Sequence, residues 1–285
     1  MPVTPPEKEN TYFVDIDDGA ETARLVNQAR LLTENLGELF PSKLDLSNVY
    51  DILDLACGPG SWALDVAHAS PDMRIVGVDI DATMVRYAAA QARVQGLDNI
   101  SFEQADILKP LEFADGSFDL VNARLLQGFM PNAAWSKLLE ECRRILRPGG
   151  IIILTECETP ITNSPAFEKM AALANQAVKL AGISFSPDGR HTGITPMLGP
   201  LLRAAGFQNI ENQAYAIDFS MGTRAHNSVI DDMAVLAELL KPFLIKHRVS
   251  TQEELDRMYN EMATTVNAAD FYGIWFYLSV FGRKP

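Results

Sequence analysis

The sequence predicts an α/β protein built on a mostly parallel, doubly wound sheet with helices on both of its faces. Three observations predict this fold class. Short apolar runs alternate with helix-like stretches, a glycine-rich turn follows the first of these runs, and an acidic residue stands near the end of each of the first three. Strands that alternate with helices form parallel sheets, because right-handed crossovers place the helices on the faces. A ligand then binds beyond the carboxyl ends of the strands.

The first predicted element is an amphipathic helix over 20–40, where leucines from Leu25 to Leu39 recur at helical spacing and Pro41 ends the pattern. Glycine turns and amphipathic spacing predict three further helices, at 60–69, 82–95 and 134–146. The predicted strands between them are the apolar runs 50–56, 73–80, 99–105, 118–123 and 150–156.

The alternation loosens after Glu156. Helices are predicted over 165–181, 196–206 and within 226–269, and two late strands over 207–220 and 271–285. We interpret residues 1–285 as one domain, because the late strands can join the same sheet. Its core would comprise about 46–160, 196–220 and 271–285, with an N-terminal helical segment at 11–45 and two lid segments, about 161–195 and 221–270.

Composition narrows the class of partner. The chain has 285 residues, 47% of them hydrophobic, and 24 Lys and Arg against 37 Asp and Glu, a net charge of −13. This charge disfavours nucleic acid and anionic membranes and favours a small molecule. The basic cluster Arg143, Arg144 and Arg147 is predicted to be a solvated helix end. An apolar surface on the lid segments would suit a homodimer.

The cysteines and the N-terminus bear on location. Cys57, Cys142 and Cys157 show no CxxC spacing, so neither a disulfide framework nor a metal site is predicted. The sequence has no apolar run long enough for a signal peptide or a membrane span. A cytoplasmic location is the expectation.

The glycine turn after the first strand carries the strongest chemical signal. The segment from Asp54 to Ala63 reads DLACGPGSWA, and its glycines let a ligand approach the backbone. The spacing also satisfies the G-x-G-x-x-A pattern of dinucleotide sites. Asp54 counts against a dinucleotide, because its carboxylate would repel a pyrophosphate and attract an ammonium. Asp79, at the end of the second strand, suits ribose hydroxyls under either interpretation.

A third acid, Asp106 in the segment QADI, follows the third strand, where it can accept a hydrogen bond from an adenine amine. Three acids at three successive strand ends describe a ligand with a cationic amino-acid end, a ribose and an adenine. That ligand is S-adenosylmethionine.

The motifs DLACGPG, VGVDID, QADIL, FDLVNA and RILRPGG, in this order, resemble those of the class I S-adenosylmethionine-dependent methyltransferases over about residues 45–160. The chain is most similar to their small-molecule branch, which includes the ubiquinone and menaquinone biosynthesis enzymes. The resemblance implies a Rossmann-like, seven-stranded sheet whose last strand is antiparallel. The methyl donor S-adenosylmethionine would leave as S-adenosylhomocysteine.

The resemblance also implies roles for single positions, which form one predicted cofactor site. The methionine portion would contact the first and fourth strand ends, and the ribose and adenine the second and third. The first helix would close over the cofactor through Arg24 and Gln28, with Tyr12 before it. The predicted cofactor residues are Asp54, Ala56, Gly58, Gly60, Asp79, Ile80, Met84, Ala105, Asp106, Ile107, Asn122, Ala123, Arg24, Gln28 and Tyr12, with Arg124 as a weaker candidate.

Catalytic residues are less well marked, because methyl transfer from a sulfonium depends mainly on positioning. Two candidates for a general base are His191, in a lid segment, and Glu156, at the end of the fifth strand. The fourth strand ends in NARL, without the Asn/Asp-Pro-Pro-aromatic turn of enzymes that methylate amines of nucleic acid or glutamine. We therefore expect O- or C-methylation of an apolar small molecule. A protein or RNA methyltransferase and an inactive cofactor-binding module are the alternatives.

Overall fold

A computed structural model describes residues 19–285, apart from the side chains of residues 19, 20 and 22. Its strands form one eight-stranded sheet with the order β3-β2-β1-β4-β5-β8-β6, and β7 pairs with β8 beside this path. The strands are β1 (Asp51–Leu55), β2 (Arg74–Asp79), β3 (Ile100–Gln104), β4 (Phe118–Arg124), β5 (Leu146–Cys157), β6 (Ile161–Thr162), β7 (Gln208–Asp218) and β8 (Gly273–Arg283).

The first five strands run parallel, whereas β8 is antiparallel to both β5 and β7. This confirms the predicted mostly parallel, doubly wound sheet with an antiparallel last strand. One strand was not predicted, because the two residues of β6 are too few for a periodic pattern. The motif RPGG was predicted to end a helix, but it lies inside β5, which begins at Leu146 directly after the helix.

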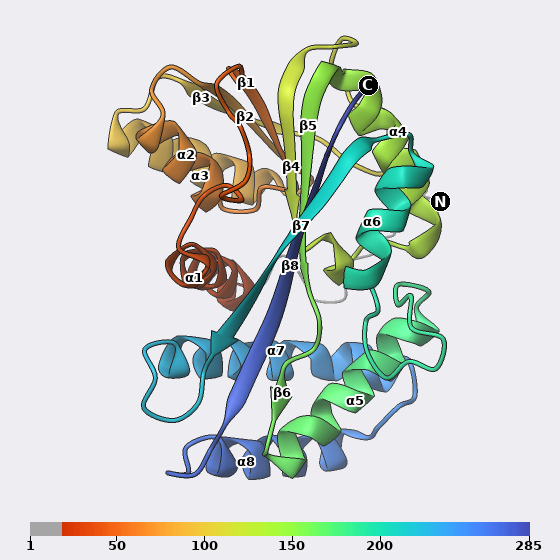
Figure 1. Cartoon of the computed structure of the whole chain (residues 1–285). Helices are drawn as coiled ribbons and strands as arrows, with labels where there is room; N and C mark the ends of the chain where they lie inside the picture. The colour runs from red at the N-terminus through yellow and green to blue at the C-terminus, as the bar shows by residue number, and fades with distance from the viewer. Residues whose placement is uncertain (1–18) are drawn as a thin grey trace, which may run out of the picture.

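Helices cover both faces of the sheet. Figure 1 shows α2 (Ser61–Ala69) and α3 (Ala82–Gln95) on one side, and α4 (Trp135–Ile145) and α6 (Thr195–Ala204) on the other. Apolar residues of α2 form a core against the sheet around Trp62 on the first side, and those of α4 and α6 form one around Trp135 on the second. Two short 3-10 turns, Leu126–Gly128 and Asn132–Ala134, connect β4 to α4.

The remaining helices gather beyond the carboxyl ends of the parallel strands, in the lower half of Figure 1. They are α1 (Gly19–Leu36), α5 (Pro165–Leu180), α7 (His226–Lys246) and α8 (Gln252–Thr265). Helices α1, α7 and α8 share an apolar cluster with β8, centred on Phe219, Phe271 and Tyr277. No helix within residues 19–285 is long and apolar enough to cross a membrane.

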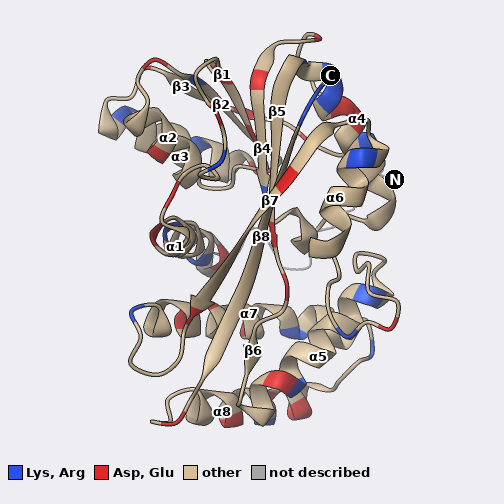
Figure 2. Cartoon of the chain, in the orientation of Figure 1, with Lys and Arg blue, Asp and Glu red and all other residues tan. Residues whose placement is uncertain are grey.

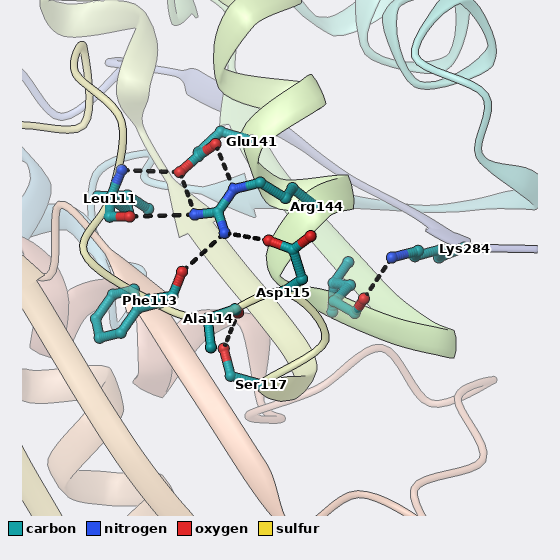
Figure 3. A network of polar contacts seen from close by, with 9 residues as sticks. Leu111, Phe113, Ala114, Asp115, Ser117, Glu141, Arg144 and Lys284 are labelled. Atoms are coloured by element: carbon teal, nitrogen blue, oxygen red, sulfur yellow. Dashed lines mark hydrogen bonds and ion pairs between the residues drawn. The ribbon is translucent and has the colours of Figure 1, made fainter.

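The basic cluster at the end of α4 is only partly the solvated helix end that the sequence predicted: Arg143 is exposed, but Arg144 and Arg147 are partly buried and pair with acids. Figure 3 shows that the Arg144 guanidinium donates to both oxygens of Glu141, to Asp115 and to the backbone carbonyls of Leu111 and Phe113. Arg147 pairs in the same way with Asp51 and Asp119, the latter at 2.6 Å. Arg144 holds the loop before β4 onto α4, and Arg147 of β5 pairs with acids of β1 and β4. Charge spacing alone could not indicate these pairings.

We expect Arg144→Ala to lower the free energy of unfolding by about 1 to 2 kcal/mol, because five hydrogen bonds are lost from a partly exposed site. The matched control is Arg143→Ala, one residue earlier and exposed on the same helix. Urea unfolding of both variants measures the difference. Equal midpoints and slopes for the two variants would contradict a structural role for Arg144.

Candidate cofactor and acceptor site

A cavity of about 390 Å³ lies between the carboxyl ends of the parallel strands and the helices gathered beyond them. One part of its wall consists of the turns and loops that follow β1 to β4. The other part consists of side chains from α1, α5, α7 and α8. The cavity is therefore located where a doubly wound sheet binds its ligands.

The glycine turn after β1 forms part of this wall, and its two glycines have different roles. Gly58 has a φ of 54°, lines the cavity, and would place a Cβ within 4 Å of no protein atom. Its missing side chain therefore leaves room for a ligand. Gly60 lies outside the cavity wall, and a Cβ there would come within 2.7 Å of Ala88 and Phe102. Gly60 thus permits close packing of the turn on α3 and β3.

Asp54 brings a buried carboxylate to the cavity at the end of β1. It accepts a hydrogen bond of 2.8 Å from the Nδ2 amide of Asn122 on the neighbouring strand β4. Burial raises the pKa of Asp54 to about 6, against the opposing influence of Arg124 and Asn122. Asn122 and Ala123 lie behind the cavity wall. Asn122 orients Asp54 through this hydrogen bond, and Ala123 is buried in the core.

Asp79, at the end of β2, connects the glycine turn to the next loop. One carboxylate oxygen accepts the backbone N–H of Gly58 at 2.8 Å, and the other accepts that of Asp81 at 2.9 Å. Burial raises the pKa of Asp79, and these hydrogen bonds oppose the rise. Because each oxygen has a second lone pair, Asp79 can hold the turn and still accept hydroxyl groups of a ligand.

The third acid lies at the opening of the cavity. Asp106 accepts the backbone N–H of Leu108 at 3.0 Å and pairs with the exposed Lys109 at 3.0 Å. Beside it, Ile80 is 49% exposed although it is a large apolar residue, and it also lines the cavity. An exposed apolar side chain next to a carboxylate suits a flat heteroaromatic ring that carries an amine. The other predicted residues on this wall are Ala56, Met84, Ala105 and Ile107.

Helix α1 closes the cavity opposite the glycine turn. Arg24 and Gln28 both line the wall, as their four-residue spacing predicted. The guanidinium of Arg24 is already engaged, however, by Glu21 at 2.7 and 2.8 Å and by Asp232 of α7 at 3.1 Å. Tyr12 lies outside the described residues.

Neither predicted general base lies on the cavity wall. His191 is exposed, and its backbone carbonyl accepts a hydrogen bond from the Ser184 hydroxyl. Glu156 is buried and accepts the backbone N–H groups of Leu126 and Gln127, the first at 2.8 Å. Burial raises the pKa of Glu156 to about 8. The periodicity of a strand cannot tell which way its last residue points, and Glu156 points into the 3-10 turn.

Sequence patterns did not predict most of the cavity wall that the lid segments form. These side chains are mainly apolar and come from the inner faces of α5, α7 and α8 and from β8, and their helical spacing looks the same as that of any core helix. Among the described residues they include Phe167, Met170, Ala174, Val178, Met233, Leu236, Leu240, Met262 and Trp275. The polar atoms of this part come from Gln127, Cys157, Glu158, Thr159, Asn175 and Thr192.

A doubly wound sheet with an antiparallel last strand, three acidic strand ends and an open glycine turn is typical of the class I S-adenosylmethionine-dependent methyltransferases. The donor set fits this cofactor. Asp54 suits the ammonium of the cofactor, Asp79 its ribose hydroxyls and Asp106 its adenine amine. Gly58 leaves room for the cofactor to approach the protein backbone.

Comparisons with known proteins support this class. Residues 52–150 match a family described as a methyltransferase domain. The chain is 36% identical over 107 residues to the probable methyltransferase ltbC of Aspergillus luteorubrus, covering 35% of this chain and 38% of that protein. It is 38% identical over 109 residues to the demethylmenaquinone methyltransferase of Thermus thermophilus, covering 38% and 48%. The chain thus spans less than half the length of these curated relatives.

Solved structures show the same fold. Phosphoethanolamine N-methyltransferase 2 of Haemonchus contortus, solved with S-adenosyl-L-methionine, superposes with a TM-score of 0.55 at 19% identity, covering 96% of this chain and 60% of that one. The YcgJ protein of Bacillus subtilis superposes with a TM-score of 0.51 at 18% identity, covering 83% and 92%. The chain therefore shares its fold with these two structures, and within it residues 52–150 match a methyltransferase domain, in agreement with the class that the motifs predicted.

Proposed function

We propose that this protein transfers the methyl group of S-adenosylmethionine to an oxygen or carbon of an apolar small molecule. The observation that carries this proposal is the composition of the cavity. Its part at the sheet has the carboxylates that suit the cofactor, and the same cavity continues into an apolar part between α5 and α7. A methyl donor and an apolar acceptor can therefore meet in one cavity.

The cofactor, when bound, supplies an already activated methyl group on its sulfonium. The residues of this chain then have to bind the cofactor and the acceptor, orient them toward one another and keep out water. Asp54, Asp79 and Asp106 would hold the two ends of the cofactor from three adjacent strands, which are fixed by the parallel ladder. Such a rigid frame supports a reaction that depends on alignment.

The acceptor part of the cavity favours an uncharged, apolar molecule. Its wall is formed by methionine, leucine, phenylalanine and tryptophan side chains, among them Met170, Met233 and Trp275. The unbranched, flexible methionine side chains can adapt to an irregular ligand. The relatives named demethylmenaquinone methyltransferase support a quinone-like acceptor for this chain.

The polar groups of the acceptor part support catalysis by positioning. Glu158 lines the cavity, but its two oxygens accept four hydrogen bonds, from Thr192, Gly193 and both donors of Thr195. Burial raises the pKa of Cys157 well above its ordinary value, so its thiol stays protonated. The proposed acceptor therefore carries a nucleophile that is acidic by itself, such as a phenol or an activated carbon.

The alternative acceptors are protein and RNA. Figure 2 shows Lys and Arg dispersed over many elements instead of gathered along one of them, and the net charge of −13 opposes binding to a polyanion. We therefore favour a small molecule in the cytoplasm as the acceptor.

A catalytically inactive binding module would retain cofactor affinity and show no transfer to any acceptor.

Calorimetric titration with S-adenosylmethionine, S-adenosylhomocysteine and NAD tests the cofactor part of the proposal. We expect binding of the first two and none of NAD. A mass-spectrometric screen of phenols and quinols for a gain of one methyl group then tests the acceptor. Binding of NAD alone, or methylation confined to protein or RNA, would contradict the proposal.

Filling the apolar part of the cavity should impair acceptor binding alone. We expect Ala174→Phe to raise the KM for the acceptor by about tenfold or more, because the added ring occupies space that the acceptor needs. Affinity for S-adenosylhomocysteine should stay unchanged. The matched control is Ala172→Phe, which is exposed on the same helix and lies off the cavity wall. An equal effect of both substitutions would place the acceptor elsewhere.

A further inference from the structure

Arg124 places a cation on the cavity wall at the end of β4, beside Asp54. Among the described residues, its guanidinium forms no hydrogen bond or ion pair. Its contact is with the indole ring of Trp62, whose centroid lies 5.8 Å away. The five N–H donors of the guanidinium thus have no partner among the described residues, and Arg124 lines both the cavity and a smaller hollow that Trp62 also lines.

This state contrasts with that of three arginines that pair with acids, of which Arg24 is buried and Arg144 and Arg147 are partly exposed. Arg24, Arg144 and Arg147 each contact two carboxylates. Burial lowers the pKa of Arg124, while Asp54 and Asp65 raise it, so the cation is partly desolvated without a direct partner. A desolvated charge of this kind is costly unless an ion of opposite charge binds to it.

Asp54 is the complementary half of the arrangement. Its carboxylate and the Arg124 guanidinium influence one another electrostatically, yet they form no ion pair. In the part of the chain that the structure describes, the hydrogen-bond donor to Asp54 is Asn122, which lies behind the wall. Two opposite charges side by side and unpaired match a ligand group that carries an ammonium and a carboxylate on one carbon.

We propose that Arg124 binds the carboxylate of the cofactor's amino-acid portion while Asp54 binds its ammonium, so that Arg24 is a structural cation and not the carboxylate ligand. The planar guanidinium can bind both oxygens of a carboxylate at once, which fixes the orientation of the amino-acid end. Arg24 cannot do so without leaving Glu21 and Asp232, the contacts that join α1 to α7. This inference rests on the proposed function, since it assigns one part of the same ligand.

The test compares two ligands that differ in one group. S-adenosylhomocysteine carries the carboxylate, and its decarboxylated analogue keeps the thioether and the ammonium. We expect the wild-type protein to bind S-adenosylhomocysteine at least about tenfold more tightly than the analogue. Arg124→Gln should remove this preference by weakening only the first ligand, and Arg124→Lys should restore part of it. Arg86→Gln, an exposed change of equal charge on α3, should keep the wild-type preference.

Arg24→Gln separates the two assignments. It should lower the thermal stability, because it leaves buried carboxylates unpaired, and the preference for the carboxylate should remain. The proposal is overturned if Arg124→Gln keeps the preference for the carboxylate, a result that would make Arg124 available to a carboxylate of the acceptor. It is also overturned if Arg24→Gln abolishes this preference. A wild-type protein that binds neither ligand would instead contradict the proposed function.

Discussion

Replacing Asp79 by alanine is expected to weaken binding of S-adenosylmethionine by about 1.5 to 3 kcal/mol, roughly a 10- to 150-fold rise in Kd. Two effects combine in this variant. The ribose hydroxyls lose a charged acceptor, and the backbone N–H groups of Gly58 and Asp81 lose the carboxylate that holds the glycine turn. Calorimetric titration of the purified variant measures the change.

Two further variants separate these effects from a loss of folding or of bulk charge. Asp79→Asn keeps one oxygen acceptor, so its Kd should lie between those of the wild type and the alanine variant. Asp72→Ala removes the same charge from an exposed position before β2, at the far end of that strand, and should bind normally. An Asp79→Ala protein that is folded and binds with wild-type affinity would contradict the assignment of Asp79 to the ribose.

Binding of S-adenosylhomocysteine is expected to weaken as the pH falls through about 6, because the carboxyl group of Asp54 has a pKa of about 6 in the free protein. The bound ammonium favours the ionised form, so the pKa of Asp54 is lower in the complex than in the free protein. The free protein therefore holds more protons than the complex below about pH 6, and acid opposes binding. Above this pH the ionised carboxylate of Asp54 contributes fully to binding, and below it the affinity drops by up to about tenfold per pH unit.

The Asp54→Asn variant should lose this dependence and bind about tenfold or more weakly above pH 7, since it cannot pair with the ammonium. The charged groups that face Asp54 are Arg124 and Asp79. Burial raises the pKa of Asp79 too, so binding to the Asp54→Asn variant keeps any smaller pH dependence that Asp79 contributes. Titrations from about pH 5 to about pH 8 in one buffer mixture measure both profiles. Parallel profiles for the two proteins would rule out Asp54 as the titrating group.

Local patterns predicted the parallel sheet and the acidic strand ends because each depends on a few neighbouring residues. The strand runs have a period that the sequence displays directly, and a residue that follows a parallel strand lies at its carboxyl edge wherever the strand is placed. For that reason Asp54, Asp79 and Asp106 all line one cavity, although they come from separate strands. The extra strand β6 and the extension of β5 through RPGG escaped prediction, because pairing with β8 and β4 decides them.

The direction in which single side chains point was less predictable. Asn122 and Gly60 belong to the predicted motifs, yet one supports Asp54 from behind and the other packs on α3. Glu156 follows the same strand-end rule as the three acids, but it turns toward the backbone of Leu126. Their roles in binding or catalysis stay predictions, because sequence patterns place a residue at an edge without choosing the face it occupies.

The sequence by itself determined the class of fold, the carboxylates that line the cavity and the glycine turn, since these follow from short-range periodicity and from residue chemistry at strand ends. Only the tertiary structure decided which charges are already paired and which apolar side chains line the cavity. Arg24 and Arg124 are the same residue type, but their surroundings differ. Packing of α1 against α7 pairs Arg24 with Asp232, whereas Arg124 contacts the ring of Trp62. Charge pairing and cavity shape arise from contacts between segments that are distant along the chain.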